Sequence, residues 1–157
     1  MSGKRSAGLL VYRVTDTGTE VLIGHMGGPF WAGREAAAWS IPKGEYTEEE
    51  RPEDAARREF REELGVPAPG GHPVPLGESR TRGGKTVTVW AVEGDLDTAD
   101  AVFGTFTMEW PRGSGTLREF PELDRVAWVE AREAAERLVA SQRVFLDRLD
   151  QHLAQAG

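Results

Sequence analysis

The segment that decides the fold is GEYTEEERPEDAARREFREELGV, residues 44–66. Its second part predicts an α-helix over residues 52–64. Pro52 suits the first position of a helix, where its missing N–H needs no partner. Gly65 suits the position after the last turn, because glycine readily takes the left-handed conformation that closes many helices. This helix has an apolar stripe to bury, spaced i, i+4 and i+8: Ala56, Phe60 and Leu64.

Three glutamates lie on another side of the same helix. Glu59, Glu62 and Glu63 are spaced i, i+3 and i+4, so at about 100° per residue they project from one side. Carboxylates this close repel one another, and Arg58 and Arg61 compensate for only part of the charge. A divalent cation would compensate for more of it. Oxygen ligands suit Mg²⁺ or Mn²⁺, whereas the sequence offers no cysteine and no clustered histidine for zinc.

The charge of the chain is concentrated in this segment. The net charge is −7, and residues 44–66 hold nine Asp or Glu against four Lys or Arg, a local net charge of −5 that leaves −2 for the rest. The ordinary interpretation of such a run is a solvated acidic helix face, and a cation site is the sharper one. An acidic chain also disfavours non-specific binding to nucleic acid, which depends on clustered Lys and Arg.

The length and composition bound the class of protein. The 157 residues suit one compact domain, which we expect to span residues 1–157. The absence of cysteine excludes disulfide scaffolds, thiolate metal sites and cysteine nucleophiles. The N-terminus has only a short apolar run, and no apolar stretch of about 18 residues occurs, so no secretion signal or membrane span is indicated. We therefore expect a cytoplasmic protein without a membrane partner.

The remaining elements surround the central helix. Short strands are expected where branched and aromatic residues cluster between turn signals, at residues 7–14, 20–26, 39–42, 76–81, 85–93, 103–110 and 125–129. Loops are expected at residues 30–38, 67–75, 95–100 and 111–121. Amphipathic helices are expected at residues 131–139 and 142–154. Strands on both sides of a central helix predict an α+β fold, with a mixed sheet and helices on its faces.

The fixed positions of the segment match a known pattern. The Nudix signature is G-x5-E-x7-R-E-U-x-E-E-x-G-U, where U is a bulky apolar residue. Nine constrained positions over 23 residues match without insertion, so chance is a poor explanation. The chain therefore resembles the Nudix hydrolases, and the resemblance outweighs the interpretation of a merely solvated helix. The matching residues are Gly44, Glu50, Arg58, Glu59, Phe60, Glu62, Glu63, Gly65 and Val66.

The resemblance implies a fold, a reaction and a metal site. The fold would be an α/β/α sandwich with a mixed β-sheet and a catalytic loop–helix–loop. The reaction would be hydrolysis of a diphosphate linked to another moiety, usually a nucleoside. By position, Glu59, Glu62 and Glu63 would bind Mg²⁺ (or Mn²⁺), helped by the main-chain carbonyl of Gly44. One of the three, most often the one that matches Glu59, would also act as general base, although some members place the base elsewhere.

Two further signature residues have a supporting part in this picture. We expect Arg58 and Glu50 to order the loop and to orient the carboxylates, and we count Arg58 with the three glutamates among the catalytic residues. The plainer interpretation of Arg58 is an i, i+4 salt bridge to Glu62, and both can hold.

Residues 39–44 bear on the substrate. Their pattern, W-x-x-P-K-G, is similar to the lead-in of diadenosine tetraphosphate hydrolases and some related nucleotide hydrolases, whereas many other family members have P-G-G there. Lys43 is therefore well placed for a phosphate. Other basic residues are candidates for phosphate contacts, with a plain surface charge as the alternative for each: Arg34, Arg80, Arg82 and Lys85.

Other side chains are considered for base stacking or as an additional general base. Several aromatic residues could stack on a base, although aromatics in strands more often belong to the core: Trp31, Trp90, Phe106 and Trp110. An extra base, which some family members keep in a later loop, could be one of three carboxylates: Glu109, Glu119 and Glu122. The three histidines show no triad or ligand spacing and are expected to be structural or exposed: His25, His72 and His152.

These features lead to one expected function and two alternatives. We expect a Mg²⁺-dependent pyrophosphohydrolase that acts on a small nucleotide, either a dinucleoside polyphosphate or a nucleoside triphosphate. The first alternative is a hydrolase for another diphosphate, such as ADP-ribose or an inositol pyrophosphate. The second is a non-catalytic module that senses a nucleotide, which the complete set of signature carboxylates disfavours.

Overall fold

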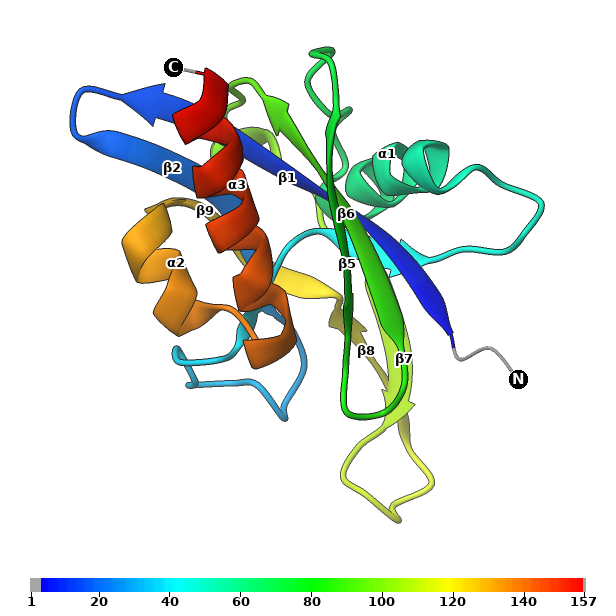
Figure 1. Cartoon of the computed structure of the whole chain (residues 1–157). Helices are drawn as coiled ribbons and strands as arrows, with labels where there is room; N and C mark the ends of the chain where they lie inside the picture. The colour runs from blue at the N-terminus through cyan, green and yellow to red at the C-terminus, as the bar shows by residue number, and fades with distance from the viewer. Residues whose placement is uncertain (1–3, 157) are drawn as a thin grey trace.

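In the computed structural model, which describes residues 4–156, a large mixed sheet lies between helices (Figure 1). The order along its main path is β3-β2-β1-β6-β5, while β4 also pairs with β1 and β9 with β2. The β1–β6 pair is parallel and the other pairs are antiparallel, so the sheet is mixed as predicted. Its strands are β1 (Arg5–Thr15), β2 (Gly18–Met26), β3 (Trp39–Ser40), β4 (Lys43–Glu45), β5 (Val74–Arg80), β6 (Thr86–Glu93) and β9 (Leu123–Glu130).

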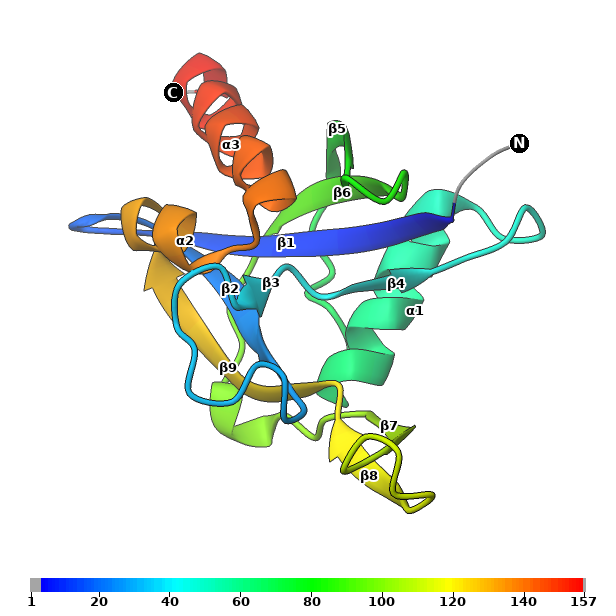
Figure 2. The same ribbon diagram turned by 90° about the horizontal axis from the view of Figure 1, so that it is seen from below.

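Helices cover both faces of this sheet. Helix α1 (Pro52–Leu64) lies on one face, and α2 (Ala131–Arg137) and α3 (Arg143–Ala156) lie on the other (Figure 2). Successive side chains of a strand point to opposite faces, so β1 contributes to two cores: Leu9 packs in the core under α1 and Leu10 in the core under α3. The predicted α/β/α sandwich is confirmed. No helix within residues 4–156 is long and apolar enough to span a membrane.

Helix α1 begins and ends where the sequence predicted. Pro52 is in its first turn, and the backbone N–H of Gly65 donates to the Arg61 carbonyl at 2.7 Å. Gly65 has a φ of +71°, and a Cβ added there would come within 2.5 Å of the Val102 carbonyl oxygen. Both the backbone conformation and the close approach therefore require glycine at the end of this helix.

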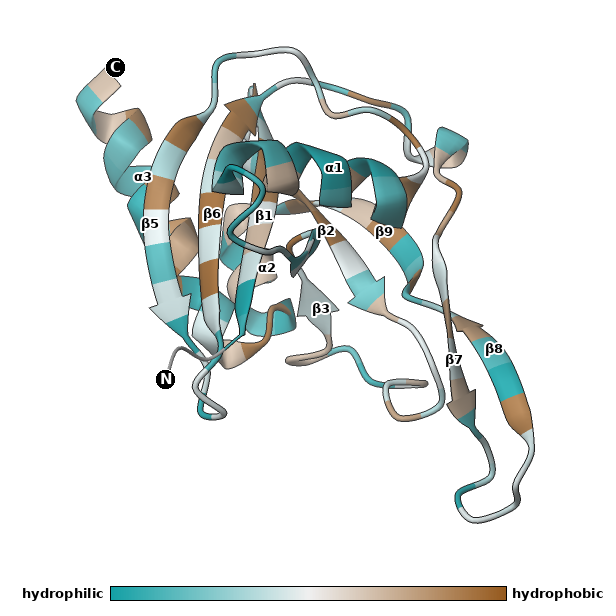
Figure 3. Cartoon of the chain, turned by 90° about the vertical axis from the view of Figure 1, so that its right-hand side faces the viewer, coloured by the Kyte–Doolittle hydropathy of each residue, from teal (hydrophilic) through white to brown (hydrophobic). Residues whose placement is uncertain are grey.

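Residues 111–121, expected to form a loop, contain a strand. This strand, β8 (Leu117–Pro121), pairs with β7 (Thr105–Glu109) in a separate two-stranded hairpin that projects from the body of the molecule (Figure 3). Proline and glycine are gathered at residues 111–115, so the turn signal at the start of the stretch concealed the strand behind it. Smaller differences are the short strand β4 and two 3-10 turns, η1 (Thr98–Asp100) and η2 (Ala140–Gln142).

Candidate active site

Strand β4 holds the start of the signature segment against β1. Lys43 lies opposite Gly8, and Gly44 lies opposite Ala7. A Cβ added to Gly8 would come within 3.0 Å of the Lys43 Cβ and of the Pro42 carbonyl oxygen, so this crossing depends on the small residue. The register therefore sets the position of Gly44 relative to helix α1.

The three glutamates of α1 approach this strand to different depths. The Glu59 carboxylate lies against Gly44, where an added Cβ would overlap it, and its side chain is only 13% exposed. Glu63 Oε1 accepts a hydrogen bond from the backbone N–H of Lys43 at 2.6 Å. Glu62 is 58% exposed. The glutamates of α1 thus lie beside the strand that carries Gly44, the glycine that the sequence singled out.

Arg58 connects the loop with the helix. Its Nε and Nη2 donate to the two carboxylate oxygens of Glu50 at 2.8 and 2.9 Å. Its Nη1 donates to Glu59 at 2.8 Å and to Glu62 at 3.1 Å. The guanidinium lowers the pKa of Glu50, because a hydrogen bond to a carboxylate favours its charged form. Arg58 therefore makes both the loop contact and the i, i+4 salt bridge considered from the sequence.

The site is short of positive charge. Burial raises the pKa of Glu63 to about 8, although the hydrogen bond from the Lys43 backbone acts in the opposite direction. Burial also raises the pKa of Glu59, against the hydrogen bond from Arg58. The charges of Glu59 and Glu122 disfavour ionisation of Glu63 further. A cation placed among these groups would favour the ionised form of each.

A pocket of about 530 Å³ lies beside these residues. Glu59, Glu62 and Glu63 are part of its lining, and two lysines join them from separate elements, Lys43 from β4 and Lys85 from the turn before β6. The pocket thus combines carboxylates that suit a divalent cation with ammonium groups that suit phosphate oxygens.

The donor set fits a hard divalent cation by its chemistry. Carboxylate and carbonyl oxygens are the usual ligands of Mg²⁺. As the side chains stand, no group of three or more Asp, Glu or His within residues 4–156 converges closely enough to hold an ion. The contacts explain this, because Arg58 spans Glu59 and Glu62 while Glu63 bonds to the backbone of Lys43.

The other basic candidates lie elsewhere. Arg34 is exposed outside this pocket, with its guanidinium 4.6 Å from the centre of the Phe30 ring. Arg80 and Arg82 are exposed and are also absent from the lining. Of the five basic residues that the sequence suggested for phosphate contacts, the structure places Lys43 and Lys85 at the pocket.

The carboxylates considered as an extra base are also separated by the structure. Glu122, between β8 and β9, lines the pocket. Glu109 accepts from the backbone N–H of Gly113 at 2.6 Å in the turn of the hairpin, and Glu119 is exposed on β8. Glu122 is therefore the one of the three that lies at the pocket.

The aromatic candidates are spread over the molecule. Trp90 packs against the core under α1, and Trp31 packs against the core under α3. Phe106 and Trp110 are half-buried in the projecting hairpin. None of these four is part of the lining of the pocket beside α1.

Three hydroxyl-bearing residues at the pocket had no signal in the sequence. Ser6, Ser40 and Thr105 come from β1, β3 and β7 and line the same pocket. Only the folded topology brings these elements together, so neither spacing nor composition could have identified them.

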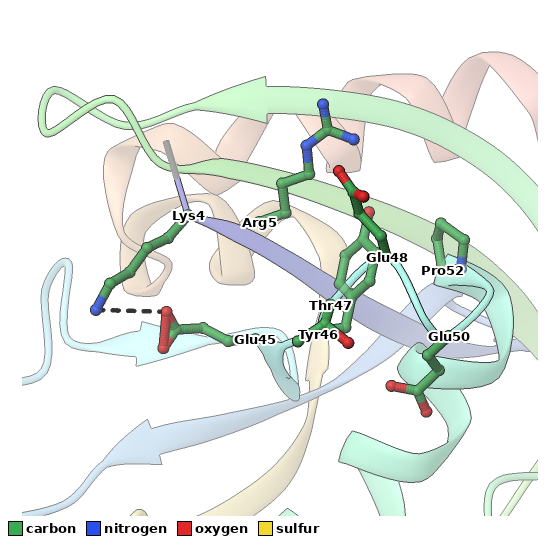
Figure 4. A pocket seen from close by; sticks show the side chains of 8 residues that line it. All are labelled: Lys4, Arg5, Glu45, Tyr46, Thr47, Glu48, Glu50 and Pro52. Carbon is green, nitrogen blue, oxygen red and sulfur yellow. Dashed lines mark ion pairs between the residues drawn. The ribbon is translucent and has the colours of Figure 1, made fainter. Parts of the chain in front are cut away.

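A second cavity, of about 630 Å³, lies on the outer side of the signature loop (Figure 4). Lys4 and Glu45 pair across part of it at 3.6 Å, and Tyr46 and Glu50 also line it. It is larger than the first pocket, but it contains none of the three glutamates of α1. The chemistry therefore favours the smaller pocket as the candidate active site.

Comparison with known proteins supports the family. The model of the NUDIX domain matches residues 4–149. No curated protein matches the sequence significantly. Among solved structures, a C. elegans Ap4A hydrolase in a binary complex has a TM-score of 0.67 at 20% identity, covering 98% of this chain and 99% of that one.

Two further solved structures share the fold. The Nudix hydrolase RenU of M. smegmatis has a TM-score of 0.62 at 22% identity, with 100% of this chain and 89% of that one covered. The NUDIX domain of Shewanella oneidensis NrtR, complexed with ADP ribose, has a TM-score of 0.63 at 14% identity, with 98% and 90% covered. Because the family model spans most of the sequence, the chain belongs to the Nudix family and is by class a pyrophosphohydrolase.

Proposed function

We propose that the chain hydrolyses a diphosphate linkage in a nucleoside polyphosphate, with Mg²⁺ (or Mn²⁺) at its glutamates. The nucleoside polyphosphate would be either a dinucleoside polyphosphate or a nucleoside triphosphate. The observation that carries the proposal is the pocket that combines the three glutamates of α1 with Lys43 and Lys85. One pocket can therefore receive a divalent cation and the phosphates that accompany it.

Each residue has a role in this proposal. Glu59, Glu62 and Glu63 would hold the cation, helped by the main-chain carbonyl of Gly44. The ion would supply neutralisation of the phosphates and a more acidic bound water. A carboxylate of the pocket would take the proton of the attacking water, with Glu59 as our first candidate because its partial burial makes it a stronger base once ionised. Glu122, from another element, is the second candidate.

The lysines and Arg58 would act in different ways. Lys43 and Lys85 would orient the phosphates and stabilise the charge that develops on the leaving group. Arg58 would act through the glutamates, since its guanidinium joins Glu50 of the loop to Glu59 and Glu62 of the helix. We therefore treat Arg58 as a positioning residue within the catalytic set.

Two features bear on the choice of substrate. Residues 39–44 resemble the lead-in of diadenosine tetraphosphate hydrolases, and the fold is similar to that of the C. elegans Ap4A hydrolase. Both favour a dinucleoside polyphosphate. The similar fold of the NrtR domain complexed with ADP ribose makes an ADP-ribose-type diphosphate the second candidate. A cytoplasmic location and a single domain over the whole chain stay predictions.

A substrate panel tests the proposal. The purified chain would be incubated with diadenosine tetraphosphate, nucleoside triphosphates and ADP-ribose, and the products would be separated by chromatography. We expect hydrolysis of a nucleoside polyphosphate that stops with EDTA and returns with excess Mg²⁺. Hydrolysis of ADP-ribose alone would select the second candidate, and inactivity towards the whole panel would contradict the reaction.

A variant ties the activity to the site. Glu62→Gln should lower kcat about 100-fold or more, because it removes one charge from the cation site. Its side chain is exposed, so the fold should be unaffected. Asp54→Asn is the matched control, since Asp54 is an exposed carboxylate in the first turn of the same helix and does not line the pocket. Full activity in Glu62→Gln would refute the assignment.

A further inference from the structure

Gln142, at the end of η2, is a buried polar residue that reaches the lead-in of residues 39–44. It is 1% exposed. Its Oε1 accepts a hydrogen bond from the backbone N–H of Ile41 at 2.8 Å, and its Nε2 donates to Oγ of Ser40 at 3.0 Å. One amide thus binds two neighbouring residues that lie 101 and 102 positions earlier in the chain.

These contacts fix the orientation of both the amide and the hydroxyl. A backbone N–H only donates, so Ile41 requires Oε1 of Gln142, and the remaining Nε2, which also only donates, faces Ser40. Oγ of Ser40 accepts that bond and gives its own hydrogen to the carbonyl of Ile41 at 2.8 Å. Because Ser40 lines the pocket, the amide orders a residue of the pocket as well as the backbone behind it.

The same short segment brings Lys43 to the pocket. Pro42 has no N–H, so the donors on either side of it are those of Ile41 and Lys43. Gln142 binds the first from the side of α3, and Glu63 of α1 binds the second at 2.6 Å. Side chains from the two faces of the sheet therefore hold consecutive backbone donors of one segment.

Gln142 is itself held in place. Its backbone N–H donates to the carbonyl of Val139 at 3.0 Å. The carbonyl of the preceding residue, Ser141, accepts from Oγ of Ser79 on β5 at 2.6 Å. The amide is therefore attached to a turn that is fixed to the sheet, and it can act as a stop for the lead-in.

Other contacts hold the backbone of the lead-in without the amide. Strand β3 pairs with β2. Two carbonyl groups accept backbone hydrogen bonds, Trp39 from Val139 at 3.0 Å and Pro42 from Leu9 at 3.1 Å. These contacts should keep the fold when the Gln142 amide is removed. They do not bind the N–H in the middle of the lead-in, which is where the amide acts.

We propose that Gln142 is a positioning residue for the candidate active site, which fixes the backbone ahead of Lys43 and so sets where Lys43 meets Glu63 and the substrate. The kinetic part of this inference rests on the proposed function. When the amide is removed, the buried N–H of Ile41 loses its partner, and such a group shifts or admits water to regain one. Pro42, whose ring fixes one backbone torsion, passes the shift on to Lys43.

Hydrogen exchange of the backbone amides, followed by NMR in EDTA, tests the positioning without any substrate or metal. In Gln142→Met we expect the Lys43 N–H to exchange about tenfold faster than in the wild type, beyond the factor shown by the slowest amides of the chain. Those amides report the change in overall stability. Gln151→Met, an exposed glutamine of α3, is the matched control. If Lys43 accelerates only as much as the slowest amides, Gln142 contributes stability alone and the proposal is wrong.

Gln142→Glu is the conservative variant, and it also serves if Gln142→Met does not fold. The carboxyl group has the shape of the amide and keeps an acceptor for the N–H of Ile41. We expect the exchange of the Lys43 N–H to stay within about threefold of the wild type, corrected in the same way. Acceleration as large as that expected for Gln142→Met would show that the bond to Ile41 does not hold Lys43.

Kinetics with diadenosine tetraphosphate, or with the substrate that the panel selects, tests the link to Lys43. Gln142→Met should raise KM about 3–10-fold and keep kcat within about threefold of the wild type. In the Lys43→Gln background the same change should raise KM less than about twofold, because both act on one contact. Additive effects would refute the link. An inactive chain would contradict the proposed function, and the exchange of Lys43 would still decide the role of Gln142.

Discussion

The two faces of the large sheet are packed by helices of different character. Under α3, the core is formed by large apolar side chains such as Phe145, Leu149 and Trp39, all buried. Under α1, two of the four buried helix residues are alanines, and the same helix carries Glu63 into a desolvated position beside the pocket. One face buries mainly apolar side chains, whereas the other combines apolar burial with a cluster of like charges.

This contrast shows where stability and function compete. A buried carboxylate with a raised pKa costs free energy in the ionised form, and that cost is tolerated where the charge serves a ligand. Within residues 4–156, no carboxylate is buried on the face under α3, and its buried polar residues make hydrogen bonds: Gln142, Ser40 and His25. Substitutions on the two faces should therefore have separable effects on stability and on activity.

The largest effect is expected from removing a buried phenylalanine on each face. Phe145 and Phe60 are both 0% exposed. Truncation of either to alanine should lower the free energy of unfolding by about 3–5 kcal/mol. Only Phe60→Ala should also lower kcat of the folded molecules, by about tenfold or more, because Phe60 adjoins Glu59 and its loss shifts the glutamates of α1.

Urea unfolding and kcat at low temperature measure the two effects on the same samples. The pair Phe145→Leu and Phe60→Leu, which removes fewer atoms, serves if an alanine variant does not fold. Equal kcat values for the variants of the two faces would show that the site does not depend on the packing under α1.

A smaller change in the free energy of unfolding, an increase instead of a decrease, is expected from Glu63→Gln. Burial raises the pKa of Glu63 from its ordinary value of 4.5 to about 8, so between these values the folded metal-free chain keeps a proton that the unfolded chain has lost. Stability of the wild type should therefore fall as the pH rises from about 4.5 to about 8. The introduced amide would keep an oxygen for the Lys43 N–H without the charge, and should stabilise the chain by about 1–3 kcal/mol at pH 8 while abolishing activity.

Unfolding in EDTA at several pH values between about 5 and 8.5 checks this prediction, since this range covers the titration of the buried carboxyl. Glu48→Gln, an exposed carboxylate in the preceding loop, should follow the wild type. If the stability of Glu63→Gln depends on pH as steeply as that of the wild type, the buried glutamate is not the source of the dependence.

The sequence predicted best what is determined locally. Helix α1 begins at Pro52 and ends before Gly65 as expected, because the proline, the left-handed glycine and the apolar stripe act within a few residues of one another. Strand β8 was missed, since its backbone partners belong to β7 and its turn is rich in proline and glycine. Local signals thus located the helix and most of the strands, whereas the strand that pairs across a turn rich in proline and glycine was missed.

The same distinction separates the parts of the site. The contacts of Arg58 with Glu50 and Glu62 span eight and four residues and were expected from the signature. The pairing of His25 with Asp124 spans 99 residues, so a histidine without motif spacing gave no sign of it. Among the basic candidates, only the fold could separate Lys43 and Lys85 from Arg34.

The smallest effect, a change in KM, is expected from Lys43. The sequence suggested this residue for a phosphate contact, and the fold places it at the pocket. Lys43→Gln should raise KM about tenfold, which corresponds to roughly 1.4 kcal/mol, because it removes the ammonium group that we propose to orient the phosphates while the backbone N–H to Glu63 remains. Arg82→Gln and Arg34→Gln, which change exposed charges outside the pocket, should leave KM within about twofold of the wild type. Steady-state kinetics of the three variants decides the matter. A larger effect at Arg34 than at Lys43 would mean that the phosphates lie towards the loop of residues 27–38, and the α1 face would then supply the cation site without the phosphate contacts.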